Sequence, residues 1–397
     1  MKRIALILAA LLLLGACTKD QYTTDKRYSR VLVLYLSDHT NLYGSINSNL
    51  SEILGQDLPF RDSDKALLVF RHPVLQYYST PSEPVLFKVS TDIYGKLVCD
   101  TLKTFSTDSR MTDPVLMRSA LQYVKDKFPS DHYGMLYSSH GTGWLPEFYY
   151  GDGADPENEV DIWDSTSSKS MGSHVNGDEL DEMELSELAS AIPMHLDYLI
   201  FDACLMGCVE VAYELRSTTD YLIASSAEIL TSGMEYAGIV GHLLKDAPYS
   251  LLEFCEAYYE KYNSRTAASQ TALVSLTDCG ELDELAGVCC ELFETYREPI
   301  STLGRYDVQG FFTGNHPWFF DLRDILVKAG ANIEELSRLD LALDACIPYK
   351  ANTPRILYTV KVDTFCGLSM YLPSCGSNFL NQYYKRLEWN KATGLVK

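Results

Sequence analysis

The stretch DYLIFDACLMGCVEVAYELR, residues 197–216, joins an apolar run to a segment with helical spacing. Residues 197–203 predict a buried β-strand, because a short apolar run bounded by polar residues is typical of one. Residues 207–216 predict a helix whose inner face carries Val211, Ala212 and Leu215. A strand that leads into a helix is the repeating unit of sheets covered by helices.

The same alternation recurs along the chain. Strands are expected at 31–36, 66–70, 85–89, 133–139, 197–203 and 221–226, and helices at 45–54, 113–128, 181–192 and 207–216. This pattern predicts an α/β fold, a mostly parallel sheet with helices on both faces. Further strands are expected at 271–276, 355–360 and 367–373, with helices near 280–296 and 333–346. We expect this carboxy-terminal part to extend or flank the same sheet.

The amino terminus, MKRIALILAALLLLGAC, has the form of an export signal. Lys2 and Arg3 give it a positive start, and its apolar run is shorter than the ~20 residues that cross a bilayer. The small residues before Cys17 resemble the lipobox of bacterial lipoproteins. We therefore expect Cys17 to carry a lipid anchor at the bacterial outer membrane or cell surface. The alternative is an ordinary signal peptide with Cys17 as a bystander.

Four segments follow from these patterns. Residues 1–16 are the predicted signal peptide, 17–29 a lipid-anchored tether, 30–262 the main α/β domain and 263–397 the carboxy-terminal part. The tether is polar and aperiodic, as a flexible linker should be.

The charge balance argues against nucleic acid and anionic membranes as partners. The chain has 33 basic and 54 acidic residues, and loss of the leader with Lys2 and Arg3 leaves 31 basic residues and a net charge of −23. An acidic surface favours cationic ligands, although acidity can equally serve solubility alone. The oligomeric state is not indicated.

The 11 cysteines predict no metal framework, because they lack the paired spacing with histidine that zinc sites use. We expect mostly buried structural cysteines, although an exported protein can also form disulfides. Cys204 and Cys208 stand one helical turn apart, which leaves a local redox or metal role open. A core position for Cys208 is the favoured interpretation.

Two polar motifs follow predicted strands, YSSHGTGW at 137–144 and FDACLMG at 201–207. In open α/β sheets, sites form at the carboxyl ends of the strands. A cysteine before a helix gains from the helix dipole, which lowers the thiol pKa, and a nearby histidine can move protons during acyl transfer. We predict Cys204 as nucleophile and His140 as acid/base. The backbone N–H groups of Gly141 and Cys204 would bind the oxyanion.

These motifs together resemble the signature of the clostripain family of cysteine peptidases. The segments 37–53, 110–141, 224–236 and 365–373 are also similar to family blocks, so the resemblance covers residues from about 30 to about 375. It implies a caspase-like α/β/α sandwich and a thiol protease whose dyad is His140 and Cys204.

The resemblance also implies a preference for Arg or Lys at the substrate position before the cleaved bond, P1. Asp202 stands where the family keeps the acid of its S1 pocket, and a buried carboxylate there would pair with a guanidinium. The alternative for Asp202 is hydrogen bonding to nearby backbone N–H groups. Glu228 is a second candidate at the pocket rim, with a solvated loop glutamate as the alternative.

The long polar segment 146–178 separates the two motifs. Members of the family are commonly matured by cleavage there, and Lys169 is its only Lys or Arg, so we predict self-cleavage after Lys169. A solvated charge without this role is the alternative. No cofactor is expected to be required, but some members depend on calcium, and the acidic residues 151–161 offer oxygen ligands without matching an EF-hand.

Two other functions remain open on the sequence alone. One is a surface lipoprotein that binds ligands without catalysis, against which the intact His140 and Cys204 count. The other is a caspase-like transamidase, which forms the same thioester and passes the acyl group to an amine.

Overall fold

The computed structural model describes residues 26–37, 42–73, 82–147, 149, 174–176, 179–312 and 318–397. The predictions for Cys17, Lys169 and the acidic residues 151–161 lie outside these ranges. No helix within them is long and apolar enough to cross a membrane.

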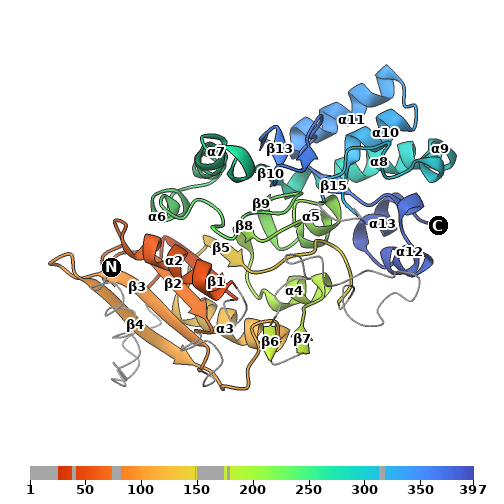
Figure 1. Ribbon diagram of the computed structural model, residues 1–397. Coiled ribbons are helices and arrows are strands. Elements are labelled where there is room, and N and C mark those ends of the chain that lie inside the picture. Colours follow the sequence, from red (N-terminus) through yellow and green to blue (C-terminus); the bar gives the residue numbers. More distant parts are fainter. Residues whose placement is uncertain are drawn as a thin grey trace.

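A nine-stranded sheet forms the centre of the molecule, in the order β12-β10-β9-β8-β5-β1-β2-β3-β4 (Figure 1). Its strands are β1 (Arg30–Leu36), β2 (Lys65–Arg71), β3 (Val85–Thr91), β4 (Leu97–Thr104), β5 (Tyr133–Ser138), β8 (Leu196–Asp202), β9 (Thr219–Ala224), β10 (Leu273–Asp278) and β12 (Tyr349–Asn352). The five central strands, from β9 to β2, are parallel. The two strands added at each flank are antiparallel.

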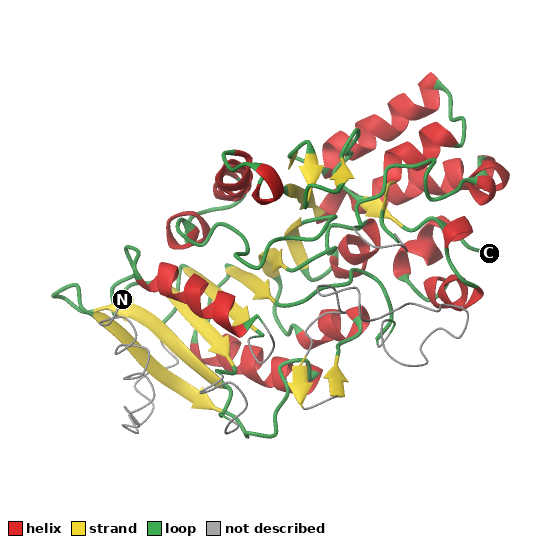
Figure 2. Cartoon of the chain, in the orientation of Figure 1, coloured by secondary structure: helices red, strands yellow, loops and turns green. Residues whose placement is uncertain are grey.

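Helices cover both faces of this sheet, and Figure 2 shows the strands as a layer between them. The helices are α2 (Tyr43–Leu54), α3 (Pro114–Lys127), α4 (Leu185–Ala191), α5 (Val209–Leu215), α6 (Ile239–Leu243), α7 (Tyr249–Asn263), α8 (Leu282–Thr295), α9 (Arg297–Thr302), α10 (Leu322–Lys328), α11 (Ile333–Cys346), α12 (Asn378–Tyr384) and α13 (Glu388–Thr393). The predicted α/β/α sandwich is confirmed.

Side-chain alternation along β1 separates the two cores. Val31, Val33 and Tyr35 pack with residues of α3, α4 and α5, whereas Leu32, Leu34 and Leu36 pack with residues of α2, α6 and α7. Both faces of β1 are buried, which explains why the sequence of this strand is one continuous apolar run.

Helix α3 leads the chain into β5, and its ends follow from local sequence. Asp113 caps its amino terminus by accepting a hydrogen bond from the Val115 N–H at 2.8 Å, and Pro114 takes the first position, where no N–H is needed. Lys125 and Lys127 lie in the last turn, where positive charge is favoured.

The carboxy-terminal part both extends and flanks the sheet. Strands β10 and β12 join the sheet edge, whereas β11 (Phe320–Asp321) pairs with β15 (Ser369–Met370) outside it. The prediction of one strand at 355–360 is wrong: β13 (Arg355–Ile356) and β14 (Val360–Lys361) form a separate hairpin. Leu357 and Tyr358 have φ angles of 45° and 65°, so the chain reverses between them. A last pair, β6 (His174–Asn176) and β7 (Glu179–Asp181), stands apart from the main sheet.

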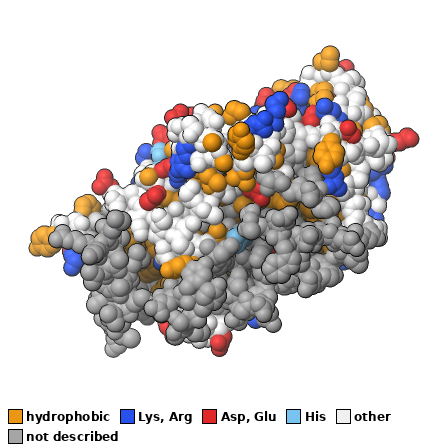
Figure 3. All heavy atoms as spheres, in the orientation of Figure 1, with side chains coloured by type: hydrophobic (Ala, Val, Ile, Leu, Met, Phe, Trp, Pro, Cys, Tyr) orange, Lys and Arg blue, Asp and Glu red, His pale blue; other side chains and the backbone are white. Residues whose placement is uncertain are grey.

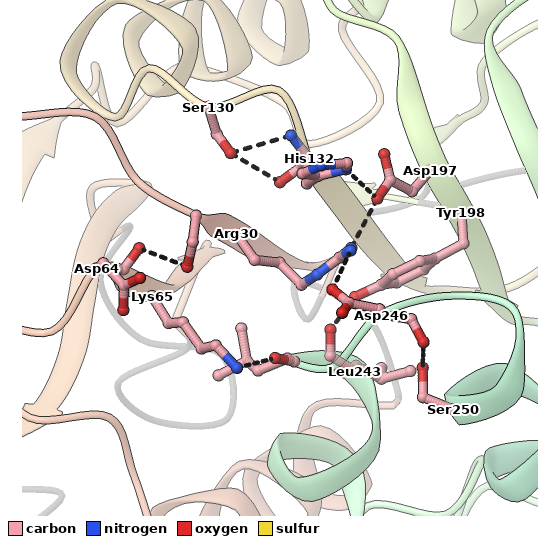
Figure 4. A network of polar contacts seen from close by, with 12 residues as sticks. Arg30, Asp64, Lys65, Ser130, His132, Asp197, Tyr198, Leu243, Asp246 and Ser250 are labelled. Carbon is pink, nitrogen blue, oxygen red and sulfur yellow. Dashed lines mark hydrogen bonds and ion pairs between the residues drawn. The ribbon is translucent and has the colours of Figure 1, made fainter.

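A polar network ties the amino-terminal ends of the parallel strands together (Figure 4). The buried Arg30 at the start of β1 donates to Asp197 at the start of β8, with 2.8 Å between Nη1 and Oδ2. His132, just before β5, lies 3.0 Å from the same oxygen, and Arg30 also reaches Asp246 before α7. This edge is opposite the one at which the predicted catalytic residues lie.

Candidate active site

The pairing of β5 with β8 brings the two predicted motifs together. In the parallel register Ser138 stands opposite Asp202, and the Ser139 N–H donates to the Asp202 carbonyl oxygen at 3.2 Å. His140 and Cys204 each follow their paired residue by two positions. Both therefore lie at the carboxyl edge of the sheet, as the sequence predicts.

Gly141 lies directly against the nucleophile segment. A β-carbon at position 141 would stand 2.5 Å from the carbonyl oxygen of Cys204 and 3.0 Å from the β-carbon of Ala203. The chain after His140 therefore packs on the chain around Cys204 through a position that only glycine can fill without displacement. His140 and Cys204 are 8% and 9% exposed, so the pair is largely shielded from water.

The Cys204 thiol is held by the backbone of Ile229, in the segment that follows β9. The Ile229 N–H donates to Sγ at 3.4 Å, and Sγ lies 3.9 Å from the Ile229 carbonyl oxygen. Burial raises the pKa of Cys204 to about 12, the Ile229 hydrogen bond opposes that rise, and the charges of Glu228 and Asp202 add to it.

The prediction that a helix dipole lowers the thiol pKa is wrong. Helix α5 begins only at Val209, and Cys208 rather than Cys204 occupies its N-cap position. The residues between Cys204 and Val209 place the thiol outside the first turn of α5. The effect of the helix dipole is confined to that turn. Desolvation dominates instead.

The turn after Cys204 has an uncommon backbone. Leu205 has a φ of 63°, and its N–H donates to the Ala227 carbonyl oxygen at 3.1 Å. Among the described residues, no acceptor is found for the backbone N–H groups of Gly141 and Cys204. The role of these two groups as donors to the oxyanion of a tetrahedral intermediate stays a prediction.

Asp202 is buried at the carboxyl end of β8, two residues before Cys204, and accepts hydrogen bonds from three groups. Ser138 Oγ donates to Oδ2 at 2.8 Å, the Tyr236 hydroxyl donates to Oδ2 at 2.5 Å, and the Met234 N–H donates to Oδ1 at 2.8 Å. Burial raises the pKa of Asp202, and these donors oppose the rise. The contacts include the backbone N–H bond that the sequence left open as an alternative; a role in S1 stays a prediction.

Glu228 is 5% exposed and adjoins Ile229, so the alternative of a solvated loop glutamate is wrong. Its charge acts on the thiol together with that of Asp202. Two carboxylates therefore lie close to the nucleophile in a region of low exposure.

The sequence did not indicate the role of the segment 225–236, which contacts both the Cys204 thiol and the Asp202 carboxylate. Ile229 holds the thiol, while Met234 and Tyr236 hold Asp202. Gly233, with a φ of 66°, lies against Asp202, and a β-carbon there would stand 2.7 Å from Oδ2. Gly233, one of two glycines between β9 and α6, was the sequence signal for a left-handed backbone at this position.

The described cysteines are all free thiols, and most are buried, as expected. Cys208 is fully buried at the start of α5, in agreement with a core position. Within the described ranges, no group of His, Cys, Asp or Glu has the arrangement of a metal site. Residues 151–161 lie outside these ranges, so the expectation that they form a flexible solvated loop, with calcium binding as the alternative, stays a prediction.

Residues 74–313 match the model of the clostripain family. Clostripain of Hathewaya histolytica is 26% identical over 236 residues, which are 54% of this chain and 42% of that relative. The match thus spans less than half the length of that protein.

Two solved structures are similar over almost their whole length. An inactive zymogen C11 protease from Parabacteroides distasonis is 27% identical with a TM-score of 0.74, and the superposition covers 94% of this chain and 99% of that one. A secreted C11 cysteine protease from Bacteroides thetaiotaomicron is 25% identical with a TM-score of 0.74, covering 92% and 99%.

Proposed function

The chain belongs to the clostripain family, and from this premise we propose that it is a cysteine endopeptidase that hydrolyses peptide bonds after Arg or Lys. The observation that carries the proposal is the adjacency of the two strand-end motifs, with Gly141 packed on the Cys204 carbonyl. The thiol of Cys204 and the side chain of His140 are both buried at one edge of the sheet, and within the described residues the N–H groups of Gly141 and Cys204 have no acceptor.

In this mechanism His140 takes the proton from the Cys204 thiol as sulfur attacks the substrate carbonyl carbon. The oxyanion that forms receives hydrogen bonds from the N–H groups of Gly141 and Cys204. His140 returns the proton to the leaving amine, and water then hydrolyses the thioester with His140 as base. The raised pKa of the resting thiol makes this proton transfer by His140 necessary at neutral pH.

Two buried carboxylates support the preference for a cationic P1 residue. Asp202 and Glu228 both act electrostatically on Cys204, so a positive side chain bound beside the thiol would meet a negative potential. The family resemblance assigns the S1 acid to Asp202, and Glu228 would supply a second charge at the rim.

A panel of fluorogenic peptides that differ only at P1 tests the activity and the preference together. We expect cleavage after Arg and Lys by the wild type and none by Cys204→Ala. A preference for neutral or acidic P1 residues would contradict the pocket assignment. Adding an amine acceptor separates hydrolysis from transamidation, because a transamidase gives mainly the amide product and a hydrolase mainly the free acid.

We also propose self-activation by cleavage after Lys169. The similarity to a protease solved as an inactive zymogen supports a maturation step. Incubation of the purified protein followed by mass spectrometry should reveal a new amino terminus at Ser170, absent from Cys204→Ala and from Lys169→Ala. Full activity of an uncut wild type would contradict the proposal.

The lipid anchor at Cys17 is proposed from the lipobox-like sequence. Metabolic labelling with a fatty acid should mark the wild type and leave Cys17→Ala unmarked. The similarity to a secreted protease supports export of the chain and does not bear on its lipidation.

A further inference from the structure

Three large apolar side chains project from one end of the molecule. Phe60, Ile93 and Tyr94, here called the apolar tip, are 63%, 82% and 87% exposed. Hydrophobic side chains stand out at the left end of the view in Figure 3, where Figure 1 places the turn between β3 and β4. Exposed apolar side chains that gather at one place mark interaction sites.

The apolar tip is built on an ordered turn. The Asp92 N–H donates to the Lys96 carbonyl oxygen at 2.9 Å, and Asp92 Oδ1 accepts from the N–H groups of Tyr94 and Lys96, each at 2.9 Å. Phe60 is brought beside this turn, because the neighbouring Arg61 N–H donates to the Thr91 carbonyl oxygen at 2.8 Å. The fold therefore holds the backbone of Phe60 beside the strand end that leads into the turn of Ile93 and Tyr94.

The proposed tether enters the fold at the same end. Lys26, the first described residue, donates to the carbonyl oxygens of Asp62 and Ser63 at 3.0 and 2.8 Å, next to Phe60 and Arg61. Cys17 lies nine positions before Lys26. Nine residues span at most about 30 Å, so a lipid on Cys17 would keep this end of the molecule near the bilayer.

The strand directions place the catalytic residues at the opposite end. Strand β3 runs antiparallel to β2, with Val89 opposite Leu67, so the turn after Thr91 lies at the amino-terminal edge of the parallel strands. His140 and Cys204 follow the carboxyl ends of β5 and β8. One strand length of seven residues, about 23 Å, separates the two edges. The network around Arg30, shown in Figure 4, holds the starts of the strands together at the amino-terminal edge of the sheet. The apolar tip lies at this same edge.

We propose that the apolar tip inserts into the interfacial layer of an uncharged lipid bilayer and holds the catalytic edge away from the membrane. Tyrosine favours this layer, where its ring meets apolar chains and its hydroxyl meets water. The exposed Lys96 can lay its stem along the same layer with its ammonium in water. The net charge of −23 that remains after loss of Lys2 and Arg3, 31 basic against 54 acidic residues, disfavours anionic lipids, so apolar burial has to supply the attraction. This inference rests on the proposed anchor at Cys17.

Brominated lipids, which quench tryptophan near the acyl chains, provide the test. The acylated protein, which begins at Cys17, is reconstituted into brominated phosphatidylcholine vesicles as Phe60→Trp, Tyr94→Trp and Tyr306→Trp. Tyr306 is the matched control, an aromatic residue 93% exposed in the segment after α9. We expect the added emission of Phe60→Trp and Tyr94→Trp to be quenched and shifted to the blue, and that of Tyr306→Trp to remain.

Equal quenching at all three positions, or none at the two tip positions, overturns the proposal. A blue shift of Tyr94→Trp in the absence of vesicles, growing with protein concentration, overturns it in favour of contact between two copies of the chain. Wild-type protein that fails to float with the vesicles overturns both the anchor and this proposal. Peptide hydrolysis measured on the same preparation tests the proposed activity separately, because a soluble peptide needs no membrane.

Discussion

Gly141 and Cys204 are in direct contact through their backbones: a β-carbon on Gly141 would stand 2.5 Å from the Cys204 carbonyl oxygen. This contact fixes the segment after the proposed base against the segment that carries the proposed nucleophile. The same two residues carry the N–H groups proposed to bind the oxyanion.

Gly141→Ala should therefore abolish peptide hydrolysis, because the added methyl group must push the two segments apart and displace the oxyanion donors. Gly287→Ala in α8 is the matched control, since nothing lies within 4 Å of its added methyl group. That control should keep its activity and gain up to ~1 kcal/mol of stability from helix propensity. Turnover close to wild type in Gly141→Ala would refute the arrangement.

The raised pKa of Cys204 predicts how His140→Ala should react with a peptidyl chloromethyl ketone. Without the base, only the small thiolate fraction reacts, so alkylation at neutral pH should nearly vanish and rise about tenfold per pH unit toward the pKa of about 12. The wild type should react readily at neutral pH because His140 accepts the proton. Mass spectrometry of the peptide containing Cys204 measures the alkylation rate of the wild type and of His140→Ala. Equal rates at pH 7 would remove His140 from the mechanism.

Asp202 can serve substrate binding or hold the segment 225–236, and two variants separate these roles. Asp202→Asn should weaken transition-state binding for Arg and Lys substrates by about 2 to 5 kcal/mol if its charge faces the substrate. Tyr236→Phe removes one donor to Asp202 and keeps the charge, so it should lower the melting temperature while the P1 preference persists. If Asp202→Asn lowers only stability, the carboxylate is a structural anchor.

Glu228→Gln tests the second carboxylate. Its negative charge raises the pKa of Cys204, so the variant should have a lower thiol pKa and a reduced preference for Arg over a neutral P1 residue of similar length. The ratio of kcat/KM for the two substrates measures the preference. An unchanged ratio would place Glu228 outside the S1 pocket.

Glu210 predicts a pH-dependent stability. It is buried in α5, and its Oε1 accepts hydrogen bonds from the Tyr371 N–H at 2.8 Å and the Tyr384 hydroxyl at 2.7 Å. Burial raises its pKa from 4.5 to about 7. The folded state thus binds the proton more tightly, so the free energy of unfolding should fall as the pH rises from about 4.5 through about 7, by on the order of 3 kcal/mol.

Glu210→Gln is neutral at every pH and should lack this decline. Melting temperatures of both proteins between pH 5 and 8 provide the comparison, and the difference between the two curves isolates Glu210 from the other buried carboxyls. Parallel curves would show that Glu210 does not titrate in this range.

The sequence by itself determined the central fold and the sheet edge at which the proposed dyad lies. The apolar run of β1 and its neighbours could be recognised because both faces of a central parallel strand are buried. His140 and Cys204 could be located because each directly follows such a run. Helix α7 was missed, as was β4, whose side chains are mostly half-buried and give no continuous apolar signal.

Only the tertiary structure decided what surrounds the thiol. Ile229 and Tyr236 lie more than 20 positions from Cys204, and chain packing rather than local pattern brings their donors to Sγ and Asp202. The same packing buries Glu228 and raises the thiol pKa, where the sequence predicted a lowering. Local sequence specifies backbone conformation and periodicity, whereas desolvation depends on atoms contributed by distant segments, and these are fixed only when the chain has folded.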